Sequence, residues 1–238
     1  MKIEELKKGL IVSCQATAEE PMRDSSVMGR FALAAQMGGA VGVRMNGVAD
    51  ILAAKQLVTI PVIGLIKHHY DGFWSYITPA LRDVEAVYAT GSEIVAVDAT
   101  RLPKPEGKTT EFLMREIKSQ FPDILLLADV STPEEGRVAE ESGADLVSST
   151  LAGYTEYTRK ESGQIIELQP PALDTVAELV QKVSVPVIAE GRYWNEVMAK
   201  EAMKAGAHNV VIGAGITRPQ IITKKIVDEL NTYMERGI

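Results

Sequence analysis

The sequence predicts an α/β protein that folds as a single (β/α)8 TIM barrel over residues 1–238. Its length of 238 residues is close to the roughly 250 that one such barrel needs. A glycine-containing repeat recurs along the chain, and eight short apolar runs alternate with helical patterns. Eight near-equal βα units joined by right-handed crossovers close into a barrel, which favours this fold over an open doubly wound sheet.

The repeat consists of Gly, then Ala or Ser, two further residues and Val. It begins at Gly39, Gly91, Gly143 and Gly206. A helix-like stretch precedes each glycine and an apolar run follows it, which is typical of a helix that ends on glycine and turns into a parallel strand. The intervals of 52, 52 and 63 residues each fit two βα units. The longer last interval predicts an insertion over residues 151–169, with a small hairpin around Gly163.

The expected strands are short and almost wholly apolar, as strands buried on both faces are. They cover residues 10–14, 41–44, 61–66, 93–97, 124–128, 145–149, 186–189 and 209–212. Helical patterns separate them, for example over 26–35 and 133–141. No linker or shift in composition divides the chain, so we expect one domain.

Composition excludes several classes of protein. Hydrophobic residues make up 46% of the chain and charged residues 24%, the balance of an ordinary globular protein. The net charge of −7 argues against nucleic acid or an anionic membrane as a partner. No apolar run approaches the ~18 residues of a membrane span, and the first residues lack the apolar core of a signal peptide. The single cysteine, Cys14, excludes an internal disulfide and predicts a reduced, soluble, cytoplasmic protein.

Polar side chains follow most of the expected strands, at the barrel face where active sites lie. They are Gln15, Arg44, Lys67, Asp98, Asp129, Ser149 with Thr150, and Glu190. At any one position the strand could simply be reaching water. A whole ring of charges at converging strand ends is harder to explain in that way, because crowded unpaired charges are costly. The pattern therefore predicts an active site at this face.

The two last strands are followed by glycines that could hold a phosphate. Gly191 and Arg192 follow the seventh strand, and Gly213, Ala214 and Arg218 follow the eighth. Bare backbone N–H groups at a helix start bind phosphate in this fold, and the two arginines would add positive charge. The alternative is that the glycines merely form a tight turn.

No metal site is expected. His68 and His69 adjoin Lys67, but adjacent residues in a loop point apart, and His208 precedes the last strand at the opposite face. Cys14 is expected to pack in the core. The aromatic residues between 70 and 76 are expected to form a loop cluster or a dimer contact.

Seven segments resemble those of a known family. They are GLIVSCQ (9–15), GVR (42–44), PVIGLIK (61–67), LAD (127–129), STLAGYT (149–155), VIAEGR (187–192) and GAGITRP (213–219). In this order they resemble the N-acetylmannosamine-6-phosphate 2-epimerases of bacterial sialic acid catabolism. The resemblance implies interconversion of N-acetylmannosamine 6-phosphate and N-acetylglucosamine 6-phosphate without a metal or organic cofactor. It also implies that Thr150 and Tyr154 contact this phosphorylated aminosugar and that the protein is a homodimer.

This chemistry assigns a role to each residue of the ring. Inversion at C2 of the open-chain sugar needs a base, a proton donor on the opposite face and groups that stabilise an enolate. Lys67 can be the base if burial and Arg44 lower its pKa, and Glu190 is its acid/base partner across the ring. Asp129 would orient Lys67 or bind the acetamido group, while Gln15 and Arg44 would hold sugar oxygens. The alternatives are a phosphate contact or a solvated side chain for Lys67, and an ion pair with Arg192 or Arg44 for Glu190.

Three classes of function stay open on the residues alone. The first is cofactor-free epimerisation of a phosphosugar, and the second is a Schiff-base aldolase in which Lys67 forms an imine. The third is a barrel that binds a phosphosugar without catalysis, which would gain nothing from opposed Lys67 and Glu190. The apolar pattern over residues 221–234 suggests a helix at a subunit contact.

Overall fold

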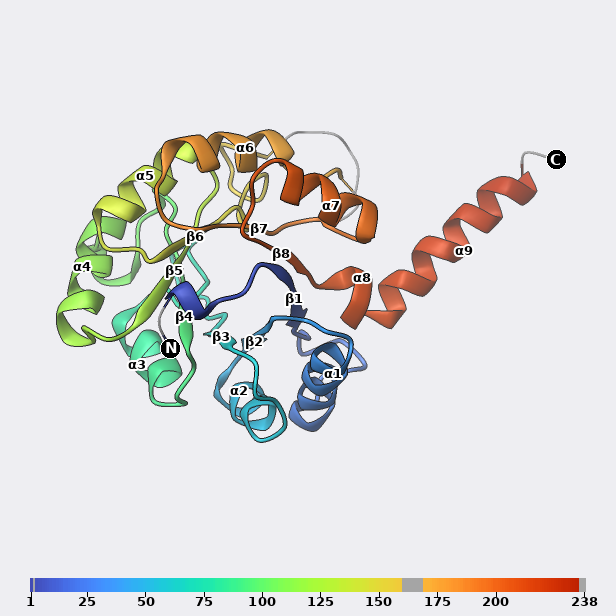
Figure 1. Cartoon of the computed structure of the whole chain (residues 1–238), viewed down its shortest axis with the longest axis horizontal. Helices are drawn as coiled ribbons and strands as arrows, with labels where there is room; N and C mark the ends of the chain where they lie inside the picture. The colour runs from blue at the N-terminus through green and yellow to red at the C-terminus, as the bar shows by residue number, and fades with distance from the viewer. Residues whose placement is uncertain (2, 160–168, 236–238) are drawn as a thin grey trace.

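Eight parallel strands close into a barrel in the order of the sequence, with β1 paired to both β2 and β8 (Figure 1). The computed structural model describes residues 1, 3–159 and 169–235. Helices surround the barrel on its outside. The predicted (β/α)8 fold is confirmed. Gly163 and the hairpin expected around it lie outside the described residues.

The strands coincide with the eight expected apolar runs to within a few residues. They are β1 Gly9–Cys14, β2 Gly42–Asn46, β3 Val62–Leu65, β4 Ile94–Asp98, β5 Leu125–Asp129, β6 Leu146–Ser148, β7 Val187–Ala189 and β8 Asn209–Ile212. One difference matters for the site. The expected end of β2 at Arg44 is wrong, because the strand continues to Asn46 and Arg44 pairs in register with Ser13 of β1. Arg44 therefore lies within the barrel wall.

The helices alternate with the strands. They are α1 Ser25–Met37, α2 Val48–Lys55, α3 Leu81–Tyr88, α4 Thr110–Gln120, α5 Pro133–Glu141, α6 Leu173–Lys182, α7 Glu196–Lys204, α8 Ala214–Thr217 and α9 Pro219–Glu235, with short 3-10 turns η1 Ile3–Glu5 and η2 Pro105–Gly107. Local sequence explains where they begin and end. Thr132 and Glu135 form a capping box at the start of α5, and the four repeat glycines all have positive φ angles, between 74° and 103°. Such backbone favours glycine, which is why the repeat marks helix ends.

Two apolar layers support the barrel. One lies between strands and helices and contains the fully buried Cys14, as expected; burial raises the pKa of this thiol to about 12. The other fills the barrel itself, with Ile11, Ile63, Leu127 and Ile188 among its members. These inward side chains form a packed floor, so polar residues can gather only above it, at the C-terminal ends of the strands.

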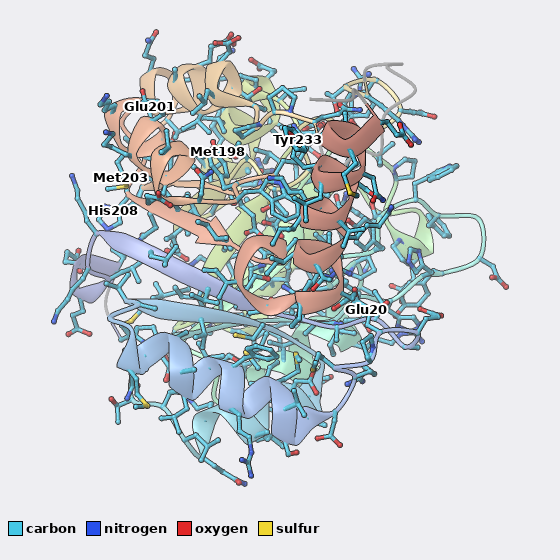
Figure 2. The ribbon with its side chains drawn as sticks, turned by 90° about the vertical axis from the view of Figure 1, so that its right-hand side faces the viewer. Glu20, Met198, Glu201, Met203, His208 and Tyr233 are labelled. Carbon is cyan, nitrogen blue, oxygen red and sulfur yellow. The ribbon has the colours of Figure 1, made fainter. Side chains whose placement is uncertain are left out.

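The last helix, α9, extends away from the barrel (Figure 1), and none of its residues is buried. Its exposed side chains include Ile226, Val227, Leu230, Tyr233 and Met234. Figure 2 turns this side of the molecule toward the viewer, with Tyr233 near the end of α9. Among the described residues, no helix has both the length and the apolar character needed to cross a membrane.

Candidate active site

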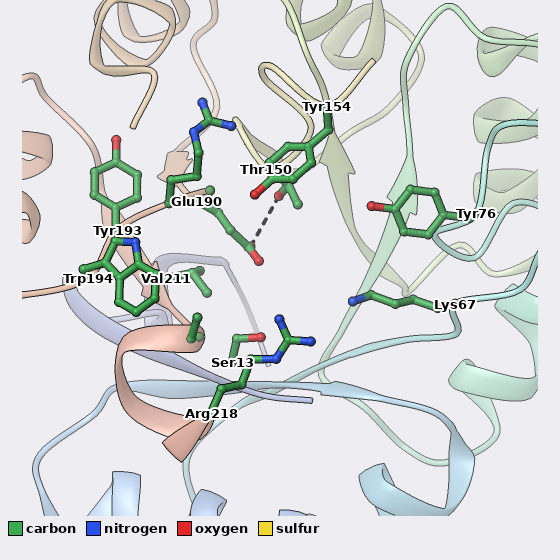
Figure 3. A pocket seen from close by; sticks show the side chains of 14 residues that line it. Ser13, Lys67, Tyr76, Thr150, Tyr154, Glu190, Tyr193, Trp194, Val211 and Arg218 are labelled. Atoms are coloured by element: carbon green, nitrogen blue, oxygen red, sulfur yellow. Dashed lines mark hydrogen bonds between the residues drawn. The ribbon is translucent and has the colours of Figure 1, made fainter. Parts of the chain in front are cut away.

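Two adjoining cavities, of about 290 Å³ and 140 Å³, open at the C-terminal ends of the strands. Together they are lined by Ser13, Gln15, Ala16, Thr17, Arg44, Asn46, Lys67, Tyr76, Ile77, Thr150, Tyr154, Glu190, Gly191, Arg192, Tyr193, Trp194, Val211, Gly213, Ala214, Thr217 and Arg218. We call this space the substrate cavity (Figure 3). Eleven of the twelve residues predicted to form the site line it. The twelfth, Asp129, is fully buried and contacts the residues that do.

A buried ion-pair cluster centred on Arg44 forms the base of the cavity. The guanidinium of Arg44 donates two hydrogen bonds to Asp129, at 2.5 Å and 3.0 Å, and one to Glu190 at 2.5 Å. Arg44 therefore spans the barrel from β2 to β5 and to the residue after β7. Burial disfavours its charge, but the two carboxylates more than offset this and raise its pKa. One guanidinium thus serves two carboxyl groups.

Asp129 contacts Arg44 and Thr150. The hydroxyl of Thr150 donates to Asp129 at 2.5 Å, in addition to the two bonds from Arg44. The role predicted for Asp129, to orient Lys67 or to bind the acetamido group, stays a prediction. Asp129 holds two groups that contact Glu190: Arg44 donates a hydrogen bond to the Glu190 carboxyl, and the hydroxyl oxygen of Thr150 lies 3.3 Å from it.

Glu190 follows β7 and is anchored by its backbone. Its N–H donates to the hydroxyl of Ser149, which donates back to the carbonyl of Glu190. Burial raises the pKa of the Glu190 carboxyl; Arg44 opposes this effect, and Asp129 reinforces it. The ion pair with Arg44 is present, but it does not keep Glu190 at the pKa of an ordinary carboxylate. A carboxyl with a raised pKa can hold and release a proton closer to neutral pH.

Lys67 approaches from the other side of the cavity. Its backbone N–H donates to the side chain of Asn46 at 2.8 Å, and Lys67 pairs with Ile77 in an antiparallel bridge. Figure 3 shows its amine pointing across the cavity toward Glu190. Burial lowers the pKa of Lys67 to about 8, with Arg44 adding to the effect. Although more than a third of the residue's surface is exposed, its amine faces the cavity, where the protein replaces much of the bulk water.

The residues predicted to bind a phosphate lie at the end of the cavity formed by β7 and β8. Gly213 and Ala214 expose backbone there, and α8 packs closely on the loop after β7. A Cβ atom at Gly215 would lie 2.4 Å from the carbonyl oxygen of Trp194, so the close approach requires glycine. Arg218 lines the cavity and pairs with Glu20 at 2.7 Å. The buried Nε of Arg218 and Oε1 of Gln15 have no hydrogen-bond partner among the described residues, which leaves them available to a ligand.

The second arginine expected at the phosphate has other partners. Arg192 donates from Nε to the carbonyl of Pro170 and from Nη1 to that of Ala152, and its guanidinium lies 5.2 Å from the ring centroid of Tyr154. Its side chain therefore holds the loop after β6 in place. Arg192 also lines the substrate cavity, so its contact with a phosphate stays a prediction.

Asp98, expected in the ring of polar strand ends, lies outside the substrate cavity. It accepts a hydrogen bond at 2.9 Å from Lys104, whose side chain is fully buried. His68 bonds to Asp83 of α3. The described residues contain no group of three or more His, Cys, Asp or Glu side chains arranged to hold a metal ion.

Sequence reasoning missed several lining residues, and Tyr76 is the most important of them. It was expected in an aromatic loop cluster, and its ring does stack on His69 with centroids 5.3 Å apart. Its hydroxyl nevertheless reaches the substrate cavity (Figure 3). Burial, with Asp98 and Asp129 adding, raises the pKa of Tyr76 and keeps it a hydrogen-bond donor. The pairing of Ile77 with Lys67 brings Tyr76 to the cavity. That pairing is a contact in the folded structure, and a loop has no periodic pattern from which it could be predicted.

Comparison with known proteins identifies relatives over nearly the whole chain. Residues 28–232 match the family described as "Putative N-acetylmannosamine-6-phosphate epimerase". A relative in Caldanaerobacter subterraneus subsp. tengcongensis, named "Putative N-acetylmannosamine-6-phosphate 2-epimerase", is 48% identical over 94% of this chain and 92% of its own length. Another of the same name, in Shouchella clausii, is 44% identical over 96% of this chain and 98% of its own length.

The chain is also similar to two solved structures. The N-acetylmannosamine-6-phosphate 2-epimerase from Clostridium perfringens superimposes with a TM-score of 0.87, at 42% identity and over 95% of both chains. The thiamine phosphate pyrophosphorylase from Pyrococcus furiosus superimposes with a TM-score of 0.58 at 19% identity over 94% of this chain and 96% of its own, a likeness of fold alone.

Proposed function

The chain belongs to the N-acetylmannosamine-6-phosphate epimerase family, and on this premise we propose that Lys67 and Glu190 invert C2 of N-acetylmannosamine 6-phosphate. The product is N-acetylglucosamine 6-phosphate. One observation supports the proposal above the others. Lys67 and Glu190 face each other in one cavity, and their pKa values are shifted toward each other, down for the lysine and up for the carboxyl.

The two shifts suit a transfer of one proton at C2. In one direction neutral Lys67 removes the C2 proton of the open-chain sugar. The electrons of the C–H bond form a double bond between C1 and C2, and the electrons of the carbonyl double bond move onto the aldehyde oxygen, giving an enolate. Protonated Glu190 then delivers a proton to C2 from the opposite face. Lys67 is now an ammonium and Glu190 a carboxylate, which are the forms that catalyse the reverse reaction. Arg44, which is hydrogen-bonded to Glu190, supplies positive charge close to the developing enolate.

The rest of the cavity fits the ends of this substrate. We assign the phosphate to the backbone of Gly191, Gly213 and Ala214 and to the guanidinium of Arg218, whose Nε has no partner among the described residues. Gln15 would bind a sugar oxygen, through a side chain whose Oε1 is likewise without a described partner. A bound phosphosugar would thus satisfy these two buried polar atoms, Nε of Arg218 and Oε1 of Gln15.

Solvent isotope exchange tests the proton transfer. Turnover in D₂O is expected to place deuterium at C2 of the product, because an amine and a carboxyl exchange their protons with water. Proton NMR would follow the loss of the C2 signal. A product that keeps its original hydrogen at C2 after full conversion would refute the transfer through Lys67 and Glu190.

A second experiment distinguishes epimerisation from the Schiff-base aldolase, which the comparisons do not favour. Borohydride added during turnover is expected to leave the protein's mass unchanged, because Lys67 acts as a base. An aldolase would instead form an imine at Lys67, and reduction would leave the sugar attached to the peptide that contains it. Mass spectrometry of that peptide decides between the two, with the Lys67→Arg variant as a control that cannot form the adduct.

We also propose that the enzyme is a homodimer that packs through α9. The observation that supports this is the row of exposed apolar side chains on a helix that the barrel does not cover. Light scattering after size exclusion would give twice the chain mass, and Leu230→Glu with Tyr233→Glu is expected to yield a monomer. A wild-type monomer at micromolar concentration would overturn the proposal.

A charged sugar phosphate does not cross membranes unaided, so we place the reaction in the cytoplasm.

A further inference from the structure

A third cavity, of about 540 Å³, lies beside the substrate cavity. It is lined by His69, Phe73, Trp74, Tyr76, Asp98, Leu102, Leu151, Tyr154, Thr155, Glu156 and Arg159, and we call it the side cavity. Tyr76 and Tyr154 line both spaces and so form the wall between them. Neither the family assignment nor the proposed proton transfer gives the side cavity a role.

The walls of the side cavity favour an uncharged, apolar occupant. Phe73, Trp74, Leu102 and Leu151 contribute apolar surface. The one charge at its base, Asp98, is neutralised by Lys104 at 2.9 Å and accepts two further hydrogen bonds from Thr100. At its edge Glu156 and Arg159 bring one charge of each sign. An ionic group would gain little binding energy here, because Asp98 is already paired with Lys104 and the charges of Glu156 and Arg159 are of opposite sign.

The side cavity also lies in a definite place relative to the substrate. Figure 3 shows Tyr76 on the side of the site away from Trp194 and Val211, which lie at the phosphate end. A 6-phosphosugar that extends from that end and places C2 between Lys67 and Glu190 therefore brings the substituent at C2 toward Tyr76 and Tyr154. In the proposed substrate that substituent is the N-acyl group.

We propose that the side cavity is the binding site for the N-acyl chain. This inference rests on the proposed function. The amide of the substrate lies at the hydroxyls of Tyr76 and Tyr154, and the alkyl part of the acyl group points between the two rings into the side cavity. An acetyl group occupies only the entrance of so large a space, so the enzyme accepts 2-acylamino sugar phosphates with longer, apolar acyl chains.

Transfer energetics set the size of the expected effect. Burial of one CH₂ group raises affinity by up to about four-fold, the equivalent of ~0.8 kcal/mol. Along the series N-acetyl, N-propanoyl and N-butanoyl mannosamine 6-phosphate, kcat/KM is therefore expected to stay level or rise by up to about four-fold at each step. A closed acetyl pocket would instead reject each added carbon by about ten-fold or more.

Filling the side cavity gives the decisive variant. Leu102→Phe adds bulk to the wall of the side cavity and is expected to lower the ratio of kcat/KM for the butanoyl substrate to kcat/KM for the acetyl substrate at least ten-fold. The ratio is measured on one preparation, so a general loss of activity cancels. Leu52→Phe, the same change on the partly exposed face of α2, is the matched control and leaves the ratio unchanged.

A second variant covers the case in which Leu102→Phe does not fold. Trp74 is 78% exposed, so Trp74→Ala spares the core while removing one apolar wall, and it is expected to lower the same ratio about two- to four-fold. A butanoyl substrate that is rejected by the wild type, or a ratio that neither variant moves, would overturn the acyl site while turnover of the acetyl substrate upholds the epimerase. No turnover of any acyl sugar phosphate would refute the proposed function itself.

Discussion

The pKa of Lys67 near 8 leads to a pH dependence that an ordinary lysine could not produce. The active form of the Lys67 and Glu190 pair carries one proton in either direction of the reaction. That proton is on Glu190 when Lys67 is the base, and on Lys67 when Glu190 is the base. Because the equilibrium constant between the two sugars does not depend on pH, both directions must share one profile. The upper limb of that profile reports the loss of the last proton from the pair.

The pKa of Lys67 sets the pH at which kcat/KM falls on the alkaline side of the profile. One pH unit above its pKa, a group keeps about a tenth of its protons. With a pKa of about 8 for Lys67, kcat/KM at pH 9 is expected to be about one tenth of its value at pH 7. With the ordinary lysine value of 10.5, almost no activity would be lost at pH 9. The lower limb is less informative, since the substrate phosphate itself titrates near pH 6.

The assay is the initial rate of epimerisation at substrate concentrations below KM, from pH 6.5 to 10 at constant ionic strength. Enzyme incubated at pH 9 and returned to pH 7 must recover full activity, which shows that the loss is a titration and not unfolding. A His69→Asn variant controls for the histidine beside the site and is expected to keep the limb near pH 8. Full activity of the wild type at pH 9.5 would refute the assignment of a shifted Lys67 to the reaction.

Four further predictions address the other groups. Glu190→Gln is expected to lower kcat by about 10²–10⁴ in steady-state assays, and near-normal turnover would reduce Glu190 to an ion-pair partner. Arg218→Ala is expected to raise KM ten- to a hundred-fold, because a charge-assisted hydrogen bond contributes about 1.5–3 kcal/mol; an unchanged KM would place the phosphate elsewhere, and Glu20→Gln, which spares the guanidinium, is the control. Arg44→Met leaves Asp129 and Glu190 buried without their counter-charge and should lower the free energy of unfolding in urea by about 3–5 kcal/mol, whereas a loss below about 1 kcal/mol would contradict the role of the cluster. Activity is expected to survive exhaustive chelation, and a loss restored by one divalent ion would show that a metal takes part.

Much of the architecture was already determined by the order of residues along the chain. The glycine repeat and the doubly buried strands are local patterns, since the positive φ at Gly91 or Gly143 and the apolar run after it depend on neighbours in sequence. Eight βα units can close into a sheet in few ways, so the barrel could be predicted from them. The polar residues at the strand ends followed too, because in a barrel the C-terminal ends of all strands meet at one face.

Which of those polar residues meet, and in what charge state, was decided only by the tertiary structure. The pairing of Arg44 with Asp129 and Glu190 joins strands far apart in sequence. It depends on the register of the closed barrel, which no single strand encodes. Asp98 does not line the substrate cavity, because it is paired with the buried Lys104. Tyr76 does line it, because the loop that contains Tyr76 folds back on Lys67. The pKa values that suit Lys67 and Glu190 to proton transfer arise in the same way, since burial and charge–charge energies depend on distances in space and not on spacing along the chain.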